Sequence, residues 1–370
     1  MIAIGLLIAL HLYVFVRLTP ALGWPVVATA LVGVLLLVSA IAIPASMMTR
    51  RMPPPWSQRL AWLGFTLMGA FSSMVLLTLL RDVILLGFGW LVPDPAALAR
   101  ISAQAVVILT GVATLLGLFN ARRRAAVVEV DVSVANLPAQ LHGFSIAQIS
   151  DVHVGQTIRH GYVNAIVETV NSLQPDVIAI TGDLVDGSVQ QLAPHVAPLG
   201  SLRARHGAYF VTGNHEYYSG AQAWVQELRR MGLTVLMNEH VILEHQGANL
   251  VLAGVTDYSA HHFNRAERSD PEAALRGAPA DAGARILLAH QPRSAMAAAA
   301  AGYDLQISGH THGGQFWPWN LFVRFQQPFT AGLARLENMW VYTSRGTGYW
   351  GPPKRLGAPS EITRIRLVRA

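Results

Sequence analysis

The sequence of 370 residues contains no cysteine. Disulfide bonds and thiolate metal ligands are therefore excluded, and the redox compartment stays undetermined. Acidic residues and histidines are scarce before Val128: that part holds only Asp82 and Asp94 of the 21 Asp and Glu residues, and only His11 of the 14 histidines. Long apolar stretches fill it instead. This imbalance indicates two regions that face different solvents, and it predicts that the first region lies in a membrane.

The apolar region, residues 1–124, is predicted to be a transmembrane domain of about four helices. Crossing hydrocarbon requires roughly 20 residues, and the stretches that approach this length are residues 1–18, 24–48, 60–80 and 101–119. The first stretch lacks the basic start of a signal peptide and more apolar spans follow it directly, which favours a membrane helix over a cleaved leader. Residues 83–92 are apolar but too short to cross alone, so we expect a re-entrant or interfacial segment there.

The arginines that flank the spans predict the side of the membrane on which the second half lies. Basic loops stay on the cytoplasmic side. With four spans, one face carries Arg50, Arg51, Arg59 and residues 122–124, and the other carries Arg17, Arg81 and Arg100. The second half is then cytoplasmic, attached to a multi-pass region of a bacterial inner membrane. A fifth span would reverse this assignment.

The net charge of +6 is not the mark of a nucleic-acid-binding protein. Residues before Val128 carry a net charge of +7, whereas those from Glu129 onward carry −1. The basic excess therefore belongs to the membrane half, where it follows topology. We expect no nucleic-acid partner, and no pattern in the sequence predicts a protein partner.

Residues 143–370 are predicted to form a separate α/β domain, joined to the membrane region by a connection at residues 125–142. Apolar, β-branched runs predict buried strands at residues 146–149, 177–180, 209–211, 286–288 and 305–307, and helical stretches lie between them. Such alternation predicts layered α/β packing.

A short polar cluster follows each of these predicted strands, where the ends of buried strands open into a ligand crevice. The clusters are Asp151-Val152-His153, Gly182-Asp183, Gly213-Asn214-His215-Glu216, His290 and Gly309-His310-Thr311-His312. Oxygen and imidazole ligands suit hard or borderline divalent cations, and two such ions held about 3.5–4 Å apart share a bridging ligand. Each cluster alone is weak support for a metal site, but all five in this order predict a two-metal hydrolase.

These clusters resemble the motifs of the calcineurin-like metallophosphoesterase superfamily, and especially of its membrane-anchored bacterial members. The likeness spans residues 144–367 and includes Gly313-Gly314-Gln315 and Ser344-Arg345-Gly346, followed by Pro352 and Arg355. The resemblance implies a multi-span α-helical membrane region followed by an α/β metallophosphoesterase domain. That domain would be a layered α/β sandwich of two mixed β-sheets flanked by helices.

The resemblance also implies how the ligands divide between two ions, which would be Mn, Fe or Zn. One ion would be held by Asp151, His153, Asp183 and His312, and the other by Asn214, His290, His310 and the bridging Asp183. His215 would stay outside both sets, close to the leaving group. None of these positions departs from the family pattern, so an active enzyme is expected.

The chemistry expected of such a centre is attack by a metal-bridging hydroxide on a phosphate ester. Two cations lower the pKa of bridging water and neutralise charge that grows on the phosphoryl oxygens. His215, whose ordinary pKa is about 6.5, would protonate the departing alkoxide. The expected catalytic residues are thus His215, Asp183 and Asn214. Arg345, which precedes Gly346 after an apolar run, is the expected contact for substrate phosphate because its planar fork suits that anion.

Three functions stay open on the sequence alone. The first is a membrane-anchored phosphoesterase acting on a phosphomonoester or phosphodiester, with lipids and lipid-linked molecules favoured because tethering raises their local concentration. The second is a soluble-nucleotide phosphodiesterase that is merely tethered. The third is a non-catalytic metal-binding module of a sensor or transporter. The apolar cores of the predicted spans contain no acidic or basic residue, which disfavours an ion pathway through them.

Overall fold

A computed structural model of the chain describes residues 2–49 and 52–370. These residues form two compact units, which are treated separately below. The first contains the chain up to Arg122 together with Gly351–Lys354, and the second contains Arg123–Trp350 and Arg355–Ala370. Met1, which begins the first predicted span, and Arg50 and Arg51, which entered the prediction of membrane topology, lie outside the described residues.

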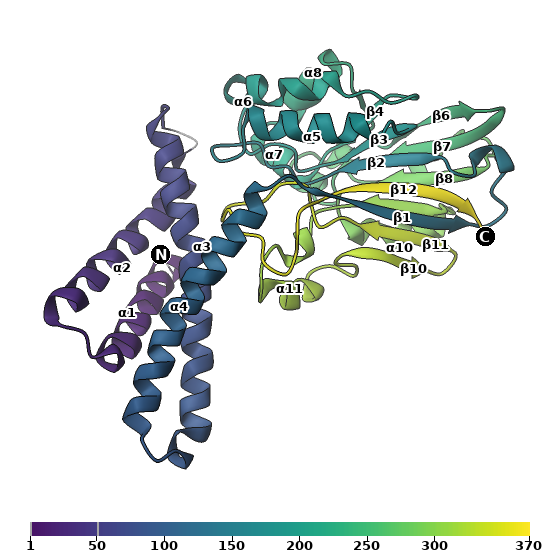
Figure 1. Cartoon of the computed structure of the whole chain (residues 1–370). Coiled ribbons are helices and arrows are strands. Elements are labelled where there is room, and N and C mark those ends of the chain that lie inside the picture. Colours follow the sequence, from purple (N-terminus) through teal and green to yellow (C-terminus); the bar gives the residue numbers. More distant parts are fainter. Residues whose placement is uncertain (1, 50–51) are drawn as a thin grey trace. The chain divides into compact units, whose positions relative to one another are not determined.

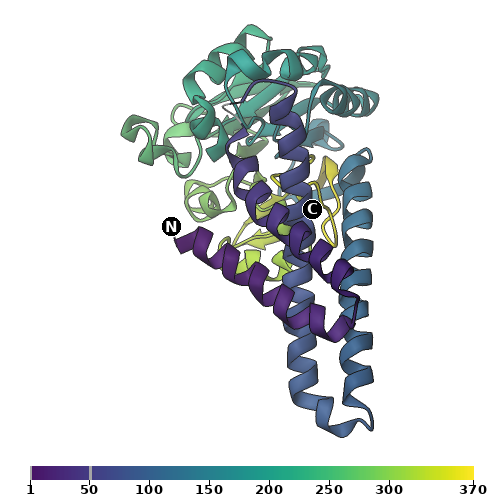
Figure 2. The same cartoon turned by 90° about the vertical axis from the view of Figure 1, so that its left-hand side faces the viewer.

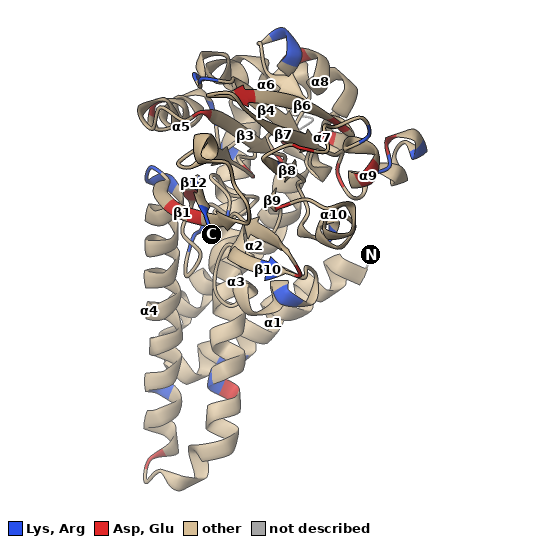
Figure 3. Cartoon of the chain, turned by 90° about the vertical axis from the view of Figure 1, so that its right-hand side faces the viewer, with Lys and Arg blue, Asp and Glu red and all other residues tan. Residues whose placement is uncertain are grey.

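Four long apolar helices make up most of the first unit (Figures 1 and 2). They are α1 (Ile2–Leu22), α2 (Val26–Met47), α3 (Trp56–Phe88) and α4 (Pro95–Arg122), and each is long and apolar enough to cross a membrane. Figure 3 shows long uncharged stretches on these helices. Their inward faces meet in an apolar cluster that includes Val14, Ile43, Phe71 and Val106. The four predicted helices are therefore present.

The third helix is longer than the sequence predicted. It continues past residue 80 and ends in a 3₁₀ turn, η2 (Gly89–Leu91), so residues 83–92 extend a helix and do not form the separate re-entrant segment that we expected. Asp82 on this extension accepts hydrogen bonds from Tyr13 and Arg17, each at 2.7 Å, and from Arg81 at 3.0 Å. These pairings offset the cost of placing charges near hydrocarbon.

Two six-stranded sheets form the centre of the second unit (Figure 1). The first sheet contains, in spatial order, β1 (Ala126–Val134), β12 (Glu361–Arg369), β2 (Ser145–Ile149), β3 (Val177–Thr181), β4 (Ala208–Val211) and β5 (Thr234–Val235). The second contains β10 (Gly332–Leu336), β11 (Met339–Thr343), β9 (Leu305–Ser308), β8 (Ala284–Leu288), β7 (Ala248–Gly254) and β6 (Glu239–His245). Both are mixed, because β12 is antiparallel to β2 and β6 is antiparallel to β7, whereas β2–β3–β4 and β7–β8–β9 run parallel.

The two sheets pack face to face, and helices cover their outer faces. The core between them joins Ile146 and Val177 of the first sheet to Leu252 and Ile286 of the second. Figure 1 shows α5 (His160–Ser172), α6 (Val189–Val196) and α8 (Ala221–Arg230) beside the first sheet, while α9 (Pro271–Ala274) and α10 (Ala295–Ala301) share a second apolar cluster with β7 and β8. The predicted sandwich of two mixed sheets flanked by helices is confirmed.

Strand β1 was not among the elements that we predicted from the sequence. It occupies half of the stretch that we expected to be a connection, and it pairs in parallel with β12 from Ala126 opposite Glu361 to Val134 opposite Arg369. Much of β1 is exposed, and its partner lies at the far end of the chain. Valine alternates with polar residues from Val128 to Val134, which is a local strand pattern that our prediction overlooked, although it does not identify the partner strand.

Candidate metal centre

All seven predicted metal ligands lie just beyond the ends of five strands. Asp151 and His153 follow β2, and Asp183 follows β3; the remaining ligands, Asn214, His290, His310 and His312, follow β4, β8 and β9. The strands β2, β3 and β4 are parallel neighbours in one sheet, and β8 and β9 are parallel neighbours in the other. Parallel neighbours end at the same edge of a sheet, which is why residues more than 150 positions apart can meet.

Six of the seven ligands form two triads of metal-binding atoms. One triad is Asp151, His153 and His312, the other is Asp183, His290 and His310, and within each triad the atoms lie within 4.8 Å of one another. In the first, the two Nε2 atoms of His153 and His312 are 3.0 Å apart. In the second, His290 Nε2 lies 3.1 Å from Asp183 Oδ2 and 3.2 Å from His310 Nδ1.

Asp183 connects the two triads. Its Oδ2 lies 3.1 Å from Nε2 of His290 in its own triad and 3.9 Å from Nε2 of His153 in the other. Its second oxygen, Oδ1, accepts a hydrogen bond of 2.9 Å from the backbone N–H of His215. A single buried carboxylate thus faces both groups of ligand atoms, which is the position that a bridging ligand requires.

The polar atoms of this site fit a pair of divalent cations. Among the described residues, Asn214 Oδ1 is buried without a hydrogen-bond partner, and leaving such an oxygen unsatisfied is costly. His290 Nδ1 donates to the carbonyl oxygen of Thr181 at 2.8 Å, and this hydrogen bond orients the ring so that Nε2 faces the centre, 3.1 Å from Asp183 Oδ2. The chemistry of the donors, carboxylate and amide oxygens with imidazole nitrogens, suits Mn, Fe or Zn.

The pKa values of the residues in the site shift in opposite directions. Burial opposes protonation of His290, but nearby carboxylates, Asp183 foremost, outweigh it and raise the pKa of His290 well above its ordinary value. Burial and the neighbouring His290 lower the pKa of His310 to about 3, so its ring is neutral, as a ligand must be. Burial alone would raise the pKa of Asp183, yet the surrounding histidines hold it well below the usual range. The site therefore presents an ionised carboxylate and attracts cations.

The backbone at the site is strained. Five of the seven ligand residues have a positive φ: Asp151 at 53°, His153 at 55°, Asp183 at 51°, His310 at 71° and His312 at 51°. Residues with side chains adopt this left-handed conformation rarely, and it persists only where the surrounding structure enforces it. Such strain concentrates at functional sites, and here it turns the side chains of successive loops toward one centre.

Two glycines are required by close approach to the ligands. A Cβ atom on Gly213 would lie 2.2 Å from Oδ1 of Asp183, and one on Gly309 would lie 2.2 Å from Oδ2 of Asp151. Both distances are far shorter than any van der Waals contact. The glycines that precede Asn214 and His310 in the sequence therefore leave space for the carboxylates of the neighbouring loops.

The structure adds Asp186 to the residues that the sequence analysis had singled out. Its Oδ1 lies 2.5 Å from Nδ1 of His215, and its Oδ2 lies 3.4 Å from Nδ1 of His153. Burial opposes protonation of His215, but the charge of Asp183 and the hydrogen bond with Asp186 raise the pKa of His215 to about 9. The signal for Asp186 was present in the sequence, since an acid three residues after Asp183 in the same loop can reach the same site.

Glu216, the last residue of the Gly-Asn-His-Glu cluster, has a structural role. Its carboxylate accepts four backbone N–H groups, from Gly213 at 2.7 Å, Leu184 at 2.8 Å, Asp183 at 3.0 Å and Val185 at 3.2 Å. It also caps the first turn of the short helix α7 (Asn214–Ser219). Glu216 thus fastens the loop after β4 to the loop after β3, and this holds Asn214 and Asp183 in register.

Two arginines from the last loop approach the centre. Arg355 is fully buried, and its Nη1 donates to the carbonyl oxygen of His312 at 3.0 Å. Arg345, the predicted phosphate contact, pairs with Glu361 at 2.8 Å, and its side chain stays about one-third exposed. It also lies against the loop of His312, because a Cβ on Gly313 would come within 3.1 Å of Arg345 Cγ. Contact of Arg345 with substrate stays a prediction.

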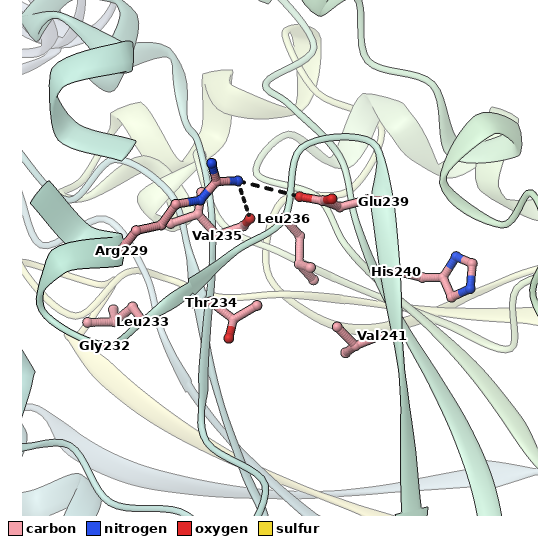
Figure 4. Close-up of a pocket in the computed structure, with 9 residues that line it drawn as sticks. All are labelled: Arg229, Gly232, Leu233, Thr234, Val235, Leu236, Glu239, His240 and Val241. Carbon is pink, nitrogen blue, oxygen red and sulfur yellow. Dashed lines mark hydrogen bonds and ion pairs between the residues drawn. The ribbon is translucent and has the colours of Figure 1, made fainter. Parts of the chain in front are cut away.

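A concavity elsewhere in the second unit does not involve the metal ligands. It has a volume of about 410 Å³ and lies between β5 and β6, where Arg229 Nη2 is 3.1 Å from the carbonyl oxygen of Val235 and 3.6 Å from Glu239 Oε1 (Figure 4). Its lining consists of Arg229, Gly232, Leu233, Thr234, Val235, Leu236, Glu239, His240 and Val241. None of these is a predicted catalytic or metal-binding residue.

Comparisons with known proteins agree with this geometry. Residues 144–314 match the family model described as calcineurin-like phosphoesterase. A bovine (Bos taurus) transmembrane protein with metallophosphoesterase domain is 42% identical over 276 residues, covering 71% of this chain and 62% of that protein. Uncharacterized metallophosphoesterases of Helicobacter pylori and Aquifex aeolicus are 37% and 32% identical over 255 and 224 residues, which cover 68% and 60% of this chain.

The extent of these matches differs between relatives. The chain spans 62% of the length of the bovine protein and 66% of the Helicobacter pylori protein, but 84% of the Aquifex aeolicus protein. The Aquifex aeolicus relative is therefore matched over most of its own length.

Proposed function

The chain belongs to the calcineurin-like metallophosphoesterase family, and from this premise we propose that it is a membrane-anchored enzyme that hydrolyses a phosphomonoester or phosphodiester. The observation that carries the proposal is the position of Asp183, whose Oδ2 faces His290 at 3.1 Å and His153 at 3.9 Å. A carboxylate shared by two ligand triads is the arrangement expected of a dinuclear hydrolase and is not needed for a structural metal site.

We assign the ligands of the two ions as the family pattern implies. Asp151, His153, Asp183 and His312 would hold one ion, and Asn214, His290, His310 and Asp183 would hold the other. The triads support this division, and the buried, unpartnered Oδ1 of Asn214 supports its place in the second set. When bound, the two ions supply positive charge that acidifies water and stabilises the phosphoryl oxygens.

His215 is the proposed proton donor to the leaving group. Its ring is nearly buried, its Nδ1 is held by Asp186, and its Nε2 lies 4.0 Å from Asp183 Oδ2, beside the triads but outside them. A carboxylate on Nδ1 favours the protonated ring and fixes its orientation, so that the proton on Nε2 can be delivered to a departing alkoxide. Asn214 and His215 are adjacent in sequence, which places ligand and acid on the same short helix.

Arg345 is the proposed contact for the phosphate of the substrate. Its backbone N–H and its Nη1 are both anchored to Glu361, at 3.0 and 2.8 Å, and the anchor holds its side chain beside the loop of His312. A guanidinium fixed in this way can present its planar fork to a phosphoryl oxygen. Glu361 is 1% exposed, so the anchor itself is buried in the domain.

We propose a lipid or lipid-linked phosphate ester as the substrate, and the cytoplasmic face of a bacterial inner membrane as the location. The four helices long and apolar enough to cross a membrane support the lipid substrate, because an enzyme held at a bilayer meets lipids at a raised local concentration. The proposed side rests on the even number of these helices and on the arginines that flank the predicted spans. A nucleotide phosphodiester is the competing substrate, and direct assay separates the two.

The test uses the full-length chain, solubilised in detergent and reconstituted with Mn(II). Hydrolysis of p-nitrophenyl phosphate, bis-p-nitrophenyl phosphate, a set of phospholipids and cyclic or linear nucleotide diesters is compared with that by Asp183→Ala as the blank. We expect metal-dependent release of product by the parent chain only. Equal rates for the parent chain and the blank would contradict the proposal and favour a metal-binding module without catalysis.

A further inference from the structure

Three exposed aromatic rings gather beside His215. Tyr218, Phe263 and Trp350 are 56%, 52% and 48% exposed. The rings of Tyr218 and Trp350 each meet the imidazole of His215 edge to face, with centroids 5.3 and 5.6 Å from it. Phe263 extends the group, because its ring lies 5.6 Å from that of Tyr218. We call Tyr218, Phe263 and Trp350 the aromatic collar.

The collar is held in place by the elements that build the metal centre. Tyr218 lies three residues after His215 on α7, so the two side chains share one face of that helix. The backbone of Trp350 is clamped by the side chain of Gln315, which accepts from its N–H at 2.9 Å and donates to its carbonyl oxygen at 3.0 Å. Gln315 itself follows directly after the last metal-binding loop. The exposed rings of Tyr218 and Trp350 are therefore fixed relative to His215.

The rings of Tyr218 and Trp350 lie where the leaving group of a substrate would meet His215. A general acid must lie within hydrogen-bond reach of the oxygen that it protonates. The first carbon atoms attached to that oxygen then lie close to the imidazole, where the rings of Tyr218 and Trp350 also lie. Large apolar side chains left exposed next to a reactive group are typical of a ligand-binding surface. The collar carries no formal charge, so it suits a neutral, apolar group and offers nothing to a sugar phosphate or a second anion.

We propose that the aromatic collar is the leaving-group subsite, and that it selects substrates whose leaving alcohol carries an apolar group close to the ester oxygen. This inference rests on the proposed function and deepens it. Both an acyl chain and a flat ring system such as a nucleobase have the required apolar surface. The shared chemistry is contact between that surface and the rings of Tyr218 and Trp350.

The test is an internal competition between two leaving groups on one phosphorus atom. Methyl octyl phosphate and methyl 2-(2-naphthyl)ethyl phosphate each offer methanol and a larger alcohol of similar acidity, and hydrolysis releases one or the other. The full-length, metal-loaded chain is incubated with each diester, and the two alcohols are quantified at low conversion, before the monoester products can be hydrolysed in turn. Because both products come from the same molecule, the ratio is independent of metal content and of partition into detergent micelles.

The collar predicts preferential release of the larger alcohol. Covering about 60 Å² of apolar surface corresponds to roughly a tenfold preference. In Trp350→Ala and Tyr218→Ala the ratio should fall toward one, whereas Trp350→Phe should retain most of it. Trp90→Ala, which removes an exposed tryptophan of the first unit, is the matched control and should leave the ratio unchanged.

The outcomes separate the inference from the function on which it rests. A preference for octanol points to acyl chains, and a preference confined to the naphthyl compound points to flat rings. Release of both alcohols at a ratio near one by the parent chain, or a preference that survives both alanine substitutions, would overturn the collar and leave the phosphoesterase intact. If a metal-loaded preparation releases neither alcohol and also fails to hydrolyse the nitrophenyl esters, both the proposed function and the proposed role of the collar are contradicted.

Discussion

Oδ1 of Asp186 lies 2.5 Å from Nδ1 of His215. The same carboxylate reaches His153 through its other oxygen, at 3.4 Å, so one side chain contacts both the proposed acid and a ligand of the first triad. Burial favours the neutral acid, but the two histidines outweigh it and lower the pKa of Asp186. An ionised Asp186 orients the imidazole of His215 and stabilises its protonated form, which is the form that a proton donor needs.

Replacing Asp186 by asparagine should impair the proton transfer more than the metal centre. The substitution keeps the shape of the side chain but removes its charge, so His215 is less often protonated and less firmly oriented. We expect kcat for esters of alkyl alcohols to fall by about 100-fold, since general acid catalysis contributes about 10²–10⁴. Esters of p-nitrophenol, whose anion leaves without protonation, should lose far less. Equal losses for both classes of ester would contradict the assigned role.

The pH dependence of the same variant has a definite sign. A proton donor acts only when it is protonated, so the rate falls as pH rises through its pKa. Burial lowers the pKa of His215, whereas the neighbouring Asp183 and Asp186 raise it. Removing the charge of Asp186 should therefore lower the pKa of His215. The alkaline limb of the kcat profile on alkyl esters should therefore move to lower pH in Asp186→Asn. A limb that stays in place or moves upward would show that another group governs it.

Asp183 and His215 should respond differently to removal of their side chains. Asp183→Ala deletes the carboxylate that faces both triads, so we expect loss of bound metal together with loss of all activity. His215→Ala deletes a group outside the triads, so we expect the metal content of the parent chain with a large fall in turnover of alkyl esters. Elemental analysis of both purified variants, beside assays on alkyl and p-nitrophenyl esters, checks this. Wild-type turnover of poor leaving groups by His215→Ala would refute the acid role.

Gly309 lies as close to a predicted metal ligand as Gly213 does. A Cβ atom there would lie 1.9 Å from Ser150 Oγ and 2.2 Å from Asp151 Oδ2, so alanine forces Asp151 to move. We expect the affinity of the first metal site to fall by about 10–100-fold, as when groups that orient metal ligands are lost. Competition with a chelator measures it. Gly161→Ala in α5 is the control, because nothing lies within 4 Å of its Cβ and alanine favours a helix.

Much of the fold and the site could be predicted because local patterns determine them. The five strands before the polar clusters have completely or almost completely buried faces, and their β-branched residues mark them in the sequence. What could not be predicted depends on distant partners. The pairing of β1 with β12 and the contact of Asp186 with His215 each join separate segments of the chain, so the sequence could offer the strand and the acid as candidates but could not identify their partners. The aromatic collar likewise joins residues from three separate segments of the chain.

Glu216 should matter for stability more than for chemistry. In Glu216→Gln one carboxylate oxygen becomes an NH₂ group, which cannot accept hydrogen bonds from the two backbone N–H groups that it then faces. Each buried donor left unsatisfied costs about 1–3 kcal/mol, so we expect the free energy of unfolding to fall by about 2–6 kcal/mol. Thermal unfolding of the detergent-solubilised chain checks it. Glu239→Gln, at a side chain that is 53% exposed, is the matched control and should change stability by less than about 0.5 kcal/mol.

The side of the membrane on which the enzyme domain lies follows from the number of crossings. At about 1.5 Å per residue, the 33 residues of α3 exceed the roughly 30 Å of hydrocarbon, so α3 crosses once and its extension adds length without adding a span. Four crossings place the domain on the same side as the loop before α3. A phosphatase reporter fused at the C-terminus should then be inactive in a bacterial host, whereas one fused after Val92, between α3 and α4, should be active. Strong activity of the C-terminal fusion would contradict the predicted topology and would place the metal centre outside the cytoplasm.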